Sequence, residues 1–200
     1  NLGFNRISFG VQDFDHDVQE AVNRVQDTEQ IKQHIIDARN MNFESINIDL
    51  MYGLPKQTVE SFRQTLDTII DLDPDRIAVY NYAHLPEMFK PQRRIEESDL
   101  PSPEEKLNIL QLSIDKLEQA GYVYIGMDHF AKKDDALVKA QQEGSLQRNF
   151  QGYSTNAECD MVAMGITAIG KIGDNYSQNV RTIDEYKNYL DRNEIPVFRG

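Results

Sequence analysis

Residues 45–55 constrain the fold more than any other stretch, because they read as a strand with a defined end. Apolar side chains occupy every second position, and this period of two predicts a β-strand. Gly53 and Pro55 end the pattern, since glycine favours turns and proline cannot donate to a ladder. Asp49 lies on the polar face, where a carboxylate is costly to bury without a partner. It is therefore a candidate ligand contact, with bracing of the following loop as the alternative.

The same strand pattern occurs at residues 6–12 and 76–83, and a shorter strand follows at 122–127. Helical patterns separate these strands, and helices are expected to start at Thr58 and at Ser102. Ser102 is followed by proline at the first helical position and glutamate at the third, as is typical of a capped helix start. Strands that alternate with helices predict an α/β fold with a parallel sheet and right-handed crossovers.

The spacing of apolar residues in the helices predicts which side chains face the core. The first long helix begins at Asp27, and its expected buried stripe is Ile31, Ile35, Ala38 and Met41. The helix after Ser102 is expected to bury Leu107, Leu110, Ile114 and Leu117. Later patterns predict helices at 134–142 and 183–190 and a strand at 197–198.

Ligands of parallel α/β folds collect at the carboxyl ends of the strands. Gln12, Asp49 and Ala83 fall at such ends in this sequence. The strand faces that point away from the helices are small or polar rather than branched and apolar, with Ser8, Gly10, Gln12, Asn47 and Asp49. The sequence therefore predicts an interior that holds a polar and sizeable ligand.

The composition excludes several classes of protein. A net charge of −12 argues against a nucleic-acid surface, and no apolar run reaches the roughly 20 residues of a membrane span. Cys159 is the single cysteine, so no internal disulfide can form, as expected in a reducing cytoplasm. One thiolate also cannot hold an iron–sulfur cluster. A start at Asn1, directly before a strand, suggests a piece of a longer chain.

Other candidates remain open at this point. Arg24 could clamp a ligand carboxylate or lie on the surface. The four histidines lack metal-ligand spacing, although His84 and His129 each follow a strand and could reach a site. Residues 84–100 read as a long loop of the kind that often forms lids. The glycines in 161–177 do not match a phosphate-binding loop and instead indicate close backbone approach.

Six ordered blocks of the sequence together resemble the oxygen-independent coproporphyrinogen III oxidases, a family of radical S-adenosylmethionine enzymes. The blocks are Gly10-Val11-Gln12-Asp13-Phe14, Val22-Asn23-Arg24, residues 47–55, residues 82–86, residues 126–131, and Asn149-Phe150-Gln151-Gly152-Tyr153. They run essentially end to end, which makes the resemblance specific.

The resemblance implies an incomplete (β/α)6 barrel, with residues 1–131 as its βα repeats and residues 132–200 as a closing and accessory segment. It implies oxidative decarboxylation of two propionates of coproporphyrinogen III to vinyl groups in haem biosynthesis. In that family a 4Fe–4S cluster and an electron donor cleave S-adenosylmethionine to a 5′-deoxyadenosyl radical, which takes a hydrogen atom from the propionate. The family further implies two S-adenosylmethionine molecules per site and a cytoplasmic monomer.

The matching motifs carry site residues over to this chain. They imply that Gln12, Arg24, Asp49, Ala83 and Ile169 contact S-adenosylmethionine. They place Phe150 and Gln151 on a segment important for activity.

The family's Cys-x-x-x-Cys-x-x-Cys motif is missing, so these 200 residues are expected to bind no cluster and to be inactive alone. A haem-carrier relative shares some of the blocks and is the nearest alternative. An unrelated barrel enzyme that uses His84 and His129 as acid and base is the other.

Overall fold

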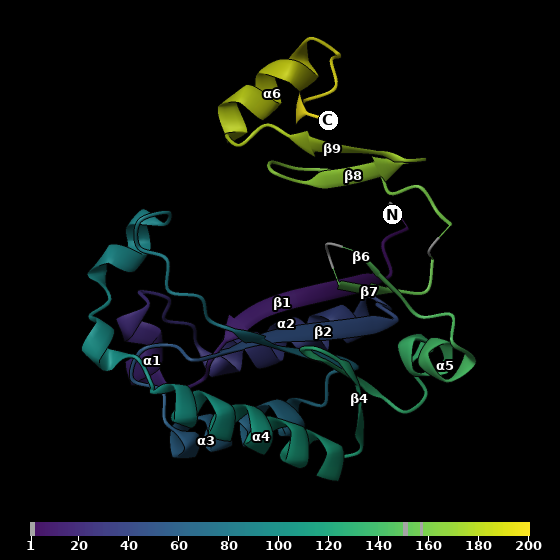
Figure 1. The fold of residues 1–200 in the computed structure, drawn as a ribbon. Helices are drawn as coiled ribbons and strands as arrows, with labels where there is room; N and C mark the ends of the chain where they lie inside the picture. Colours follow the sequence, from purple (N-terminus) through teal and green to yellow (C-terminus); the bar gives the residue numbers. More distant parts are fainter. Residues whose placement is uncertain (1–2, 150–151, 157) are drawn as a thin grey trace. The chain divides into compact units, whose positions relative to one another are not determined.

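The structure is a computed structural model that describes residues 3–149, 152–156 and 158–200. Two compact units make up the chain, one that extends to Leu146 and one formed by Gln147–Gly200 (Figure 1).

The first unit is built on a five-stranded mixed sheet with the order β1-β2-β3-β5-β4. Its strands are β1 (Arg6–Gln12), β2 (Ser45–Tyr52), β3 (Arg76–Asn81), β4 (Tyr122–Gly126) and β5 (His129–Lys132). The first three strands are parallel, as the sequence predicts. The expectation of a purely parallel sheet is wrong, because β5 is antiparallel to both β3 and β4.

A tight hairpin explains this difference. The chain reverses at Met127 and Asp128, where Met127 takes a left-handed φ of 48°. The carbonyl of Asp128 accepts a hydrogen bond from Val79 N at 2.7 Å, which ties the hairpin to β3. Strand β5 therefore lies between β3 and β4. A strand of four residues gives too short a pattern to be recognised from sequence periodicity.

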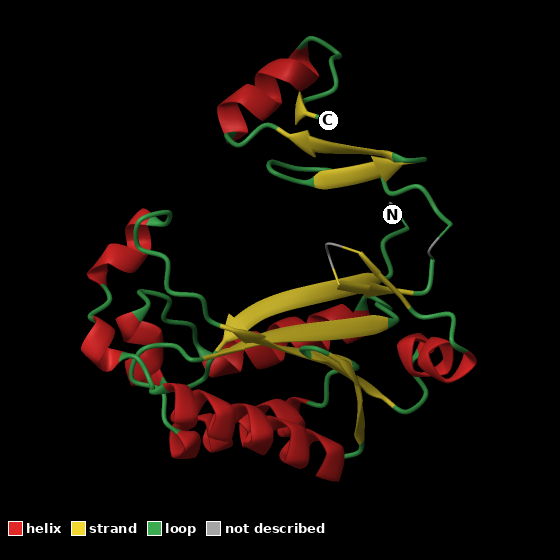
Figure 2. Ribbon diagram, viewed as in Figure 1, coloured by secondary structure: helices red, strands yellow, loops and turns green. Residues whose placement is uncertain are grey.

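Helices cover one face of this sheet (Figures 1 and 2). They are α2 (Thr28–Asn40), α3 (Val59–Leu72) and α4 (Pro103–Gln119). The short helix α1 (His16–Ala21) lies beyond the carboxyl end of β1, and α5 (Ala136–Glu143) lies beside β4. The core between α2, α3, α4 and the sheet contains Ile31, Ile35, Ile46, Ile48, Leu50, Phe62, Leu66, Ile69, Ile77, Val79, Ile109 and Phe130. The predicted apolar face of β2 is thus fully buried against helices, and the polar face of β1 and β2 is the opposite one.

The helix starts agree with the sequence signals. The hydroxyl of Thr58 accepts from Ser61 N in a capping box, and the hydroxyl of Ser102 accepts from Glu105 N. Asp27 caps α2 through Glu29 N. These bonds satisfy amide groups that the first helical turn leaves without partners.

Two of the predicted core residues are exposed. Met41 is 71% exposed because it lies one position beyond the end of α2, as the C-cap. Leu107 is 67% exposed because the buried stripe of α4 is Ile109, Ser113 and Leu117 instead. The Ser113 hydroxyl is satisfied inside the core by the carbonyl of Ile109 at 2.7 Å. A buried serine of this kind gives no apolar signal in the sequence.

The second unit contains two small antiparallel sheets and a helix. One sheet pairs β6 (Gln147–Asn149) with β7 (Gly152–Ser154). The other has the order β10-β9-β8 and is formed by β8 (Ile169–Ile172), β9 (Asn175–Asn179) and β10 (Val197–Arg199). The helix α6 (Ile183–Asp191) lies between β9 and β10 in the chain.

The predicted close backbone approach in the glycine-rich segment is confirmed at Gly170. A Cβ atom there would lie 2.9 Å from the carbonyl oxygen of Met161, closer than real side chains come. The backbone of Met161 pairs with that of Lys171 in an isolated bridge. Glycine is needed here because a second chain segment occupies the place of a side chain.

Candidate functional site

A cavity of about 400 Å³ lies at the carboxyl ends of β1 and β2 in the first unit. Its lining comes from the ends of these strands, the turn after α1, and the segment that follows β3. The lining residues are Gln12, Ala21, Val22, Asn23, Arg24, Met51, Leu54, Tyr82, Pro91, Gln92, Arg94 and Ile95. The volume is within the range of about 300–1,000 Å³ that small-molecule pockets span.

Gln12, the last residue of β1, has an unusual backbone conformation and unusual side-chain hydrogen bonding. Its φ is +74°, a left-handed conformation that is unfavourable for a residue with a side chain. Its Oε1 atom is buried, and among the residues that the structure describes it has no hydrogen-bond partner. A buried acceptor without a donor costs free energy. Both features are expected where a site is prepared for a ligand.

Arg24 reaches the same cavity from the turn after α1. Its Nη2 donates to the carbonyl oxygen of Gly10 at 2.7 Å, and its backbone N donates to the carbonyl of Gln19. A Cβ atom at position 10 would lie 2.8 Å from Gln12 Nε2 and 3.6 Å from Arg24 Nη2. Gly10 therefore leaves the space in which both side chains lie over the strand.

Asp49 is not among the residues that line this cavity. It lies within β2, paired in register with Gly10. Its carboxylate accepts from Asn47 Nδ2 at 2.7 Å and from Ser8 Oγ at 3.2 Å. Within the described residues, the hydrogen-bond partners of Asp49 are thus neighbours on the sheet rather than groups of the following loop. The carbonyl of Ala83, one residue after the cavity-lining Tyr82, accepts from Gln92 Nε2 at 3.1 Å.

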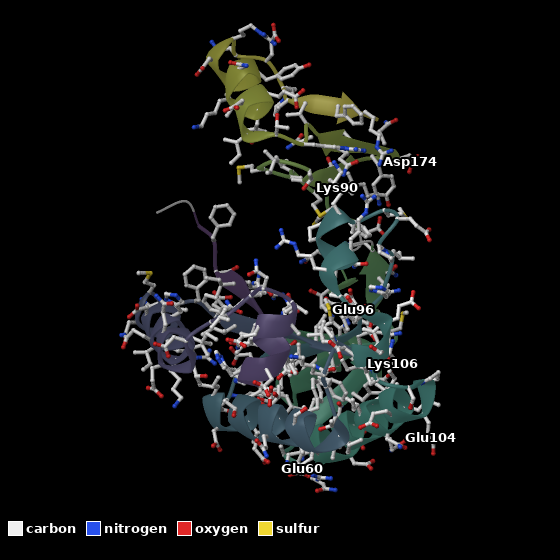
Figure 3. The ribbon with its side chains drawn as sticks, turned by 90° about the vertical axis from the view of Figure 1, so that its left-hand side faces the viewer. Glu60, Lys90, Glu96, Glu104, Lys106 and Asp174 are labelled. Atoms are coloured by element: carbon white, nitrogen blue, oxygen red, sulfur yellow. The ribbon has the colours of Figure 1, made fainter. Side chains whose placement is uncertain are left out.

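The segment 84–100 closes one side of the cavity and contains two short 3₁₀ helices, Lys90–Arg94 and Glu97–Asp99. Figure 3 shows it between Lys90 and Glu96, with Lys106 at the start of α4. Gln92 fixes the segment by accepting from Leu85 N at 2.5 Å, and the carbonyl of Asp99 accepts from Lys56 N at 2.7 Å.

Sequence reasoning missed Gln92 and Arg94, which both line the cavity. Arg94 forms no ion pair with any carboxylate in the described part of the chain, so its charge is available to a ligand. The only available signal was that the long loop follows a strand, because nothing in the loop's composition distinguishes Arg94 from Arg93.

Tyr82 forms part of the wall and is buried, which raises the pKa of its phenol. Its hydroxyl lies 3.2 Å from Nδ1 of His84. The second candidate histidine, His129, stands in β5 with its ring edge-on to that of Tyr80. Each histidine therefore packs against a tyrosine of the β3 region.

The other predicted site residues belong to the second unit. Ile169 begins β8 and lines a surface cavity with Tyr176 and Gln178. Phe150 and Gln151 lie outside the described residues. Within the described ranges, no group of three His, Cys, Asp or Glu side chains could hold a metal ion, and no helix is long and apolar enough to cross a membrane.

The cavity at the carboxyl ends of β1 and β2 fits a ligand that carries an anion, a hydrogen-bond donor and an apolar part. Arg24 and Arg94 offer guanidinium groups, and Gln12 Oε1 offers an acceptor that has no donor among the described residues. Val22, Leu54 and Tyr82 supply apolar surface from one hydrophobic cluster. S-Adenosylmethionine combines these features in its carboxylate, its ammonium and ribose hydroxyls, and its adenine.

Comparison with known proteins relates the chain to radical SAM enzymes. Residues 1–69 match the family model of the radical SAM superfamily. The solved coproporphyrinogen III oxidase from Escherichia coli, described as a radical SAM enzyme, superposes with a TM-score of 0.90 at 54% identity, covering 99% of this chain and 46% of that one. The chain is thus homologous to radical SAM enzymes and shares their α/β fold.

Within this class the chain resembles the oxygen-independent coproporphyrinogen III oxidases, as the sequence blocks indicate. It is 56% identical over 199 residues to the protein of that name from Pseudomonas aeruginosa and 54% identical over 198 residues to that from Escherichia coli. These alignments take in 100% and 99% of the chain but 43% of each relative. The chain therefore spans less than half the length of these relatives.

Proposed function

We propose that the protein to which this chain corresponds is an oxygen-independent coproporphyrinogen III oxidase, and that the cavity between Gln12 and Arg24 binds S-adenosylmethionine. The observation that carries the proposal is the buried Gln12 Oε1, which has no donor in the described part of the chain, beside the Arg24 guanidinium at the carboxyl ends of β1 and β2. The identity of 54–56% with proteins of that name supports the reaction assigned to it.

Arg24 holds the carboxylate of the methionine part, and Gln12 Oε1 accepts from its ammonium or from a ribose hydroxyl. Asp49 offers a further acceptor on the open face of the sheet, and backbone groups at Ala83 or at Ile169 read the adenine edge. Phe150 and Gln151 serve the same reaction through the segment that the family resemblance assigns to activity.

The reaction converts two propionate side chains of coproporphyrinogen III to vinyl groups and gives protoporphyrinogen IX in haem biosynthesis. Each propionate gives a hydrogen atom to the 5′-deoxyadenosyl radical and one further electron to a one-electron acceptor, and its carboxylate leaves as carbon dioxide. A 4Fe–4S cluster, when bound, supplies the one-electron reduction of the sulfonium, with electrons from a separate donor. The residues of this chain bind and orient the nucleoside.

Several finer features belong to the same proposal. Two S-adenosylmethionine molecules share the site. The strands of residues 1–131 form part of an incomplete (β/α)6 barrel, and residues 132–200 close it and add an accessory segment. The protein acts as a monomer in the cytoplasm.

Residues 1–200 alone carry no cluster and no activity in this proposal, because their single cysteine, Cys159, cannot replace the several thiolates that a cluster requires. Anaerobic reconstitution of the chain with iron and sulfide tests this point. We expect no charge-transfer absorbance in the visible region, and its appearance would refute the statement.

Anaerobic turnover by the intact protein tests the function itself. With S-adenosylmethionine and a reductant, we expect coproporphyrinogen III to be consumed and carbon dioxide released, and the Arg24→Ala variant to lose this activity through weaker S-adenosylmethionine binding. Tight haem binding without any turnover would contradict the proposal and favour the haem-carrier alternative.

A further inference from the structure

Four polar side chains lie beneath the cavity without lining it: Asp13, Gln19, Gln57 and Thr65, which we call the polar brace. They are 1%, 4%, 3% and 1% exposed. Buried polar groups cost free energy unless they are hydrogen-bonded. The bonds that these four side chains make run mainly to the backbone of segments that form the cavity.

The carboxylate of Asp13 is the centre of the polar brace. It accepts from Thr65 Oγ1 at 2.6 Å, from Asp15 N at 2.8 Å and from Gln57 Nε2. Burial raises the pKa of Asp13, and the bonds from Thr65, Asp15 and Gln57 oppose that rise. Asp13 directly follows Gln12, so these bonds hold the backbone where β1 turns into the site.

Gln57 connects Asp13 to the end of β2. Its Nε2 also donates to the carbonyl of Met51 at 2.8 Å. Its Oε1 accepts from Gly53 N at 2.6 Å and from Leu54 N at 3.1 Å. Since Met51 and Leu54 both line the cavity, one buried amide fixes two points of this wall.

Gln19 connects Asp13 to the turn that carries Arg24. Its Nε2 donates to the carbonyl of Asp13 at 2.8 Å, and its Oε1 accepts from Gln26 N at 3.0 Å. Its own carbonyl accepts from Arg24 N at 2.8 Å. The backbone on both sides of the Arg24 side chain is therefore tied to the buried network.

We propose that the polar brace sets the relative positions of Gln12, Arg24 and the Met51–Leu54 wall, so that its members are positioning residues for the nucleoside. This inference rests on the function proposed above. Because polar networks of this kind have one satisfied arrangement, loss of one member allows the three walls to shift independently.

The test uses the intact protein and four substitutions. Thr65→Val removes one donor to Asp13 at nearly constant volume, and Thr65→Ser restores the hydroxyl. Gln57→Leu removes the link to β2. Ser113→Ala is the matched control, since Ser113 is equally buried but bonds only within α4. Affinity for S-adenosylmethionine is measured by calorimetry at a temperature at which thermal melts show every variant folded.

We expect Thr65→Val and Gln57→Leu to raise the Kd about tenfold, the equivalent of one buried hydrogen bond. Thr65→Ser should restore binding, and Ser113→Ala should leave the Kd unchanged although it lowers the melting temperature. Amide exchange at Gly53 and Leu54 should accelerate in Gln57→Leu.

The outcomes separate the two proposals. If the wild-type protein binds S-adenosylmethionine and the Thr65→Val and Gln57→Leu proteins bind it equally well, the positioning role is overturned while the proposed function stands. If affinity falls as much in Ser113→Ala, the effect is one of stability and the positioning role is again overturned. If the wild-type protein does not bind S-adenosylmethionine, the proposed function fails, and the positioning role fails with it.

Discussion

Gln12 has a backbone conformation and a side-chain environment that are both unfavourable in the free protein. Its backbone is left-handed, and its side-chain oxygen is buried without a donor in the described structure. Each feature costs free energy in the unliganded state. A bound ligand that donates to Oε1 removes the free-energy cost of the buried acceptor. The conformation of Gln12 is therefore more favourable in the complex than in the free protein.

Gln12→Gly should therefore separate stability from binding. We expect the free energy of unfolding to rise by about 1 kcal/mol, because glycine tolerates positive φ, while S-adenosylmethionine binding weakens. Urea denaturation and calorimetry measure the two effects. Asn42→Gly is the control, since Asn42 has a φ of 60° in a turn that does not line the cavity. It should gain less stability, because asparagine already tolerates positive φ, and it should keep full affinity.

Arg94 offers a second cation to the ligand from the 84–100 segment. We expect Arg94→Ala to raise the Kd for S-adenosylmethionine roughly fivefold, because a solvent-facing ion pair contributes about 1 kcal/mol at most. Lys90→Ala, on the same 3₁₀ helix but outside the cavity lining, should change the Kd little. Equal effects of both substitutions would indicate only a loss of overall charge.

At the scale of elements, the periodicity of apolar residues was sufficient to predict the strands and helices that have one apolar face. The bounds of β1 and the starts of α3 and α4 agree with the sequence, because alternation and capping are local signals. The wrong prediction for Met41 comes from the position of the helix end, since Met41 is the C-cap of α2. The other wrong predictions concern tertiary effects. The buried face of α4 includes Ser113, and β5 is recruited into the sheet by its pairing with β3.

Gly170 lets the three-stranded sheet of the second unit approach the segment at Met161. We expect Gly170→Ala to destabilise this unit by about 1–3 kcal/mol, because the added methyl group must displace a backbone carbonyl. Ile172→Ala, at an exposed position of the same strand, should cost much less. Hydrogen exchange of the β8 and β9 amides resolves the effect within the unit, and unchanged exchange in Gly170→Ala would contradict it.

At the scale of the whole molecule, the sequence predicted the end of β1 at Gln12 and a polar ligand-binding interior, but not the residues that later segments contribute to the cavity. Asp49, expected at a strand end, lies three residues before the end of β2. The cavity also needs Arg94, Gln92 and the wall at Leu54, which converge only through folding. The polar brace could not be predicted from the sequence either. Asp13 and Gln57 are 44 residues apart, and buried polar residues give no periodic core signal.

The buried Asp13 makes stability depend on pH. A raised pKa means that folded Asp13 takes up a proton more readily than the unfolded chain does. Its contribution to stability is therefore full below the ordinary value of 3.8 and is lost as the pH rises through the raised folded value. Asp13→Asn lacks this titration. We expect the unfolding free energy of the variant minus that of the wild type to increase with pH above about pH 4. A flat or falling difference in urea denaturation would contradict this.

The most direct test of the account is a crystal structure of the intact protein with S-adenosylmethionine. The account predicts the ligand carboxylate against the Arg24 guanidinium and a ligand donor within hydrogen-bond distance of Gln12 Oε1. A nucleoside bound elsewhere, with Arg24 turned to solvent and Gln12 Oε1 still unpaired, would contradict it.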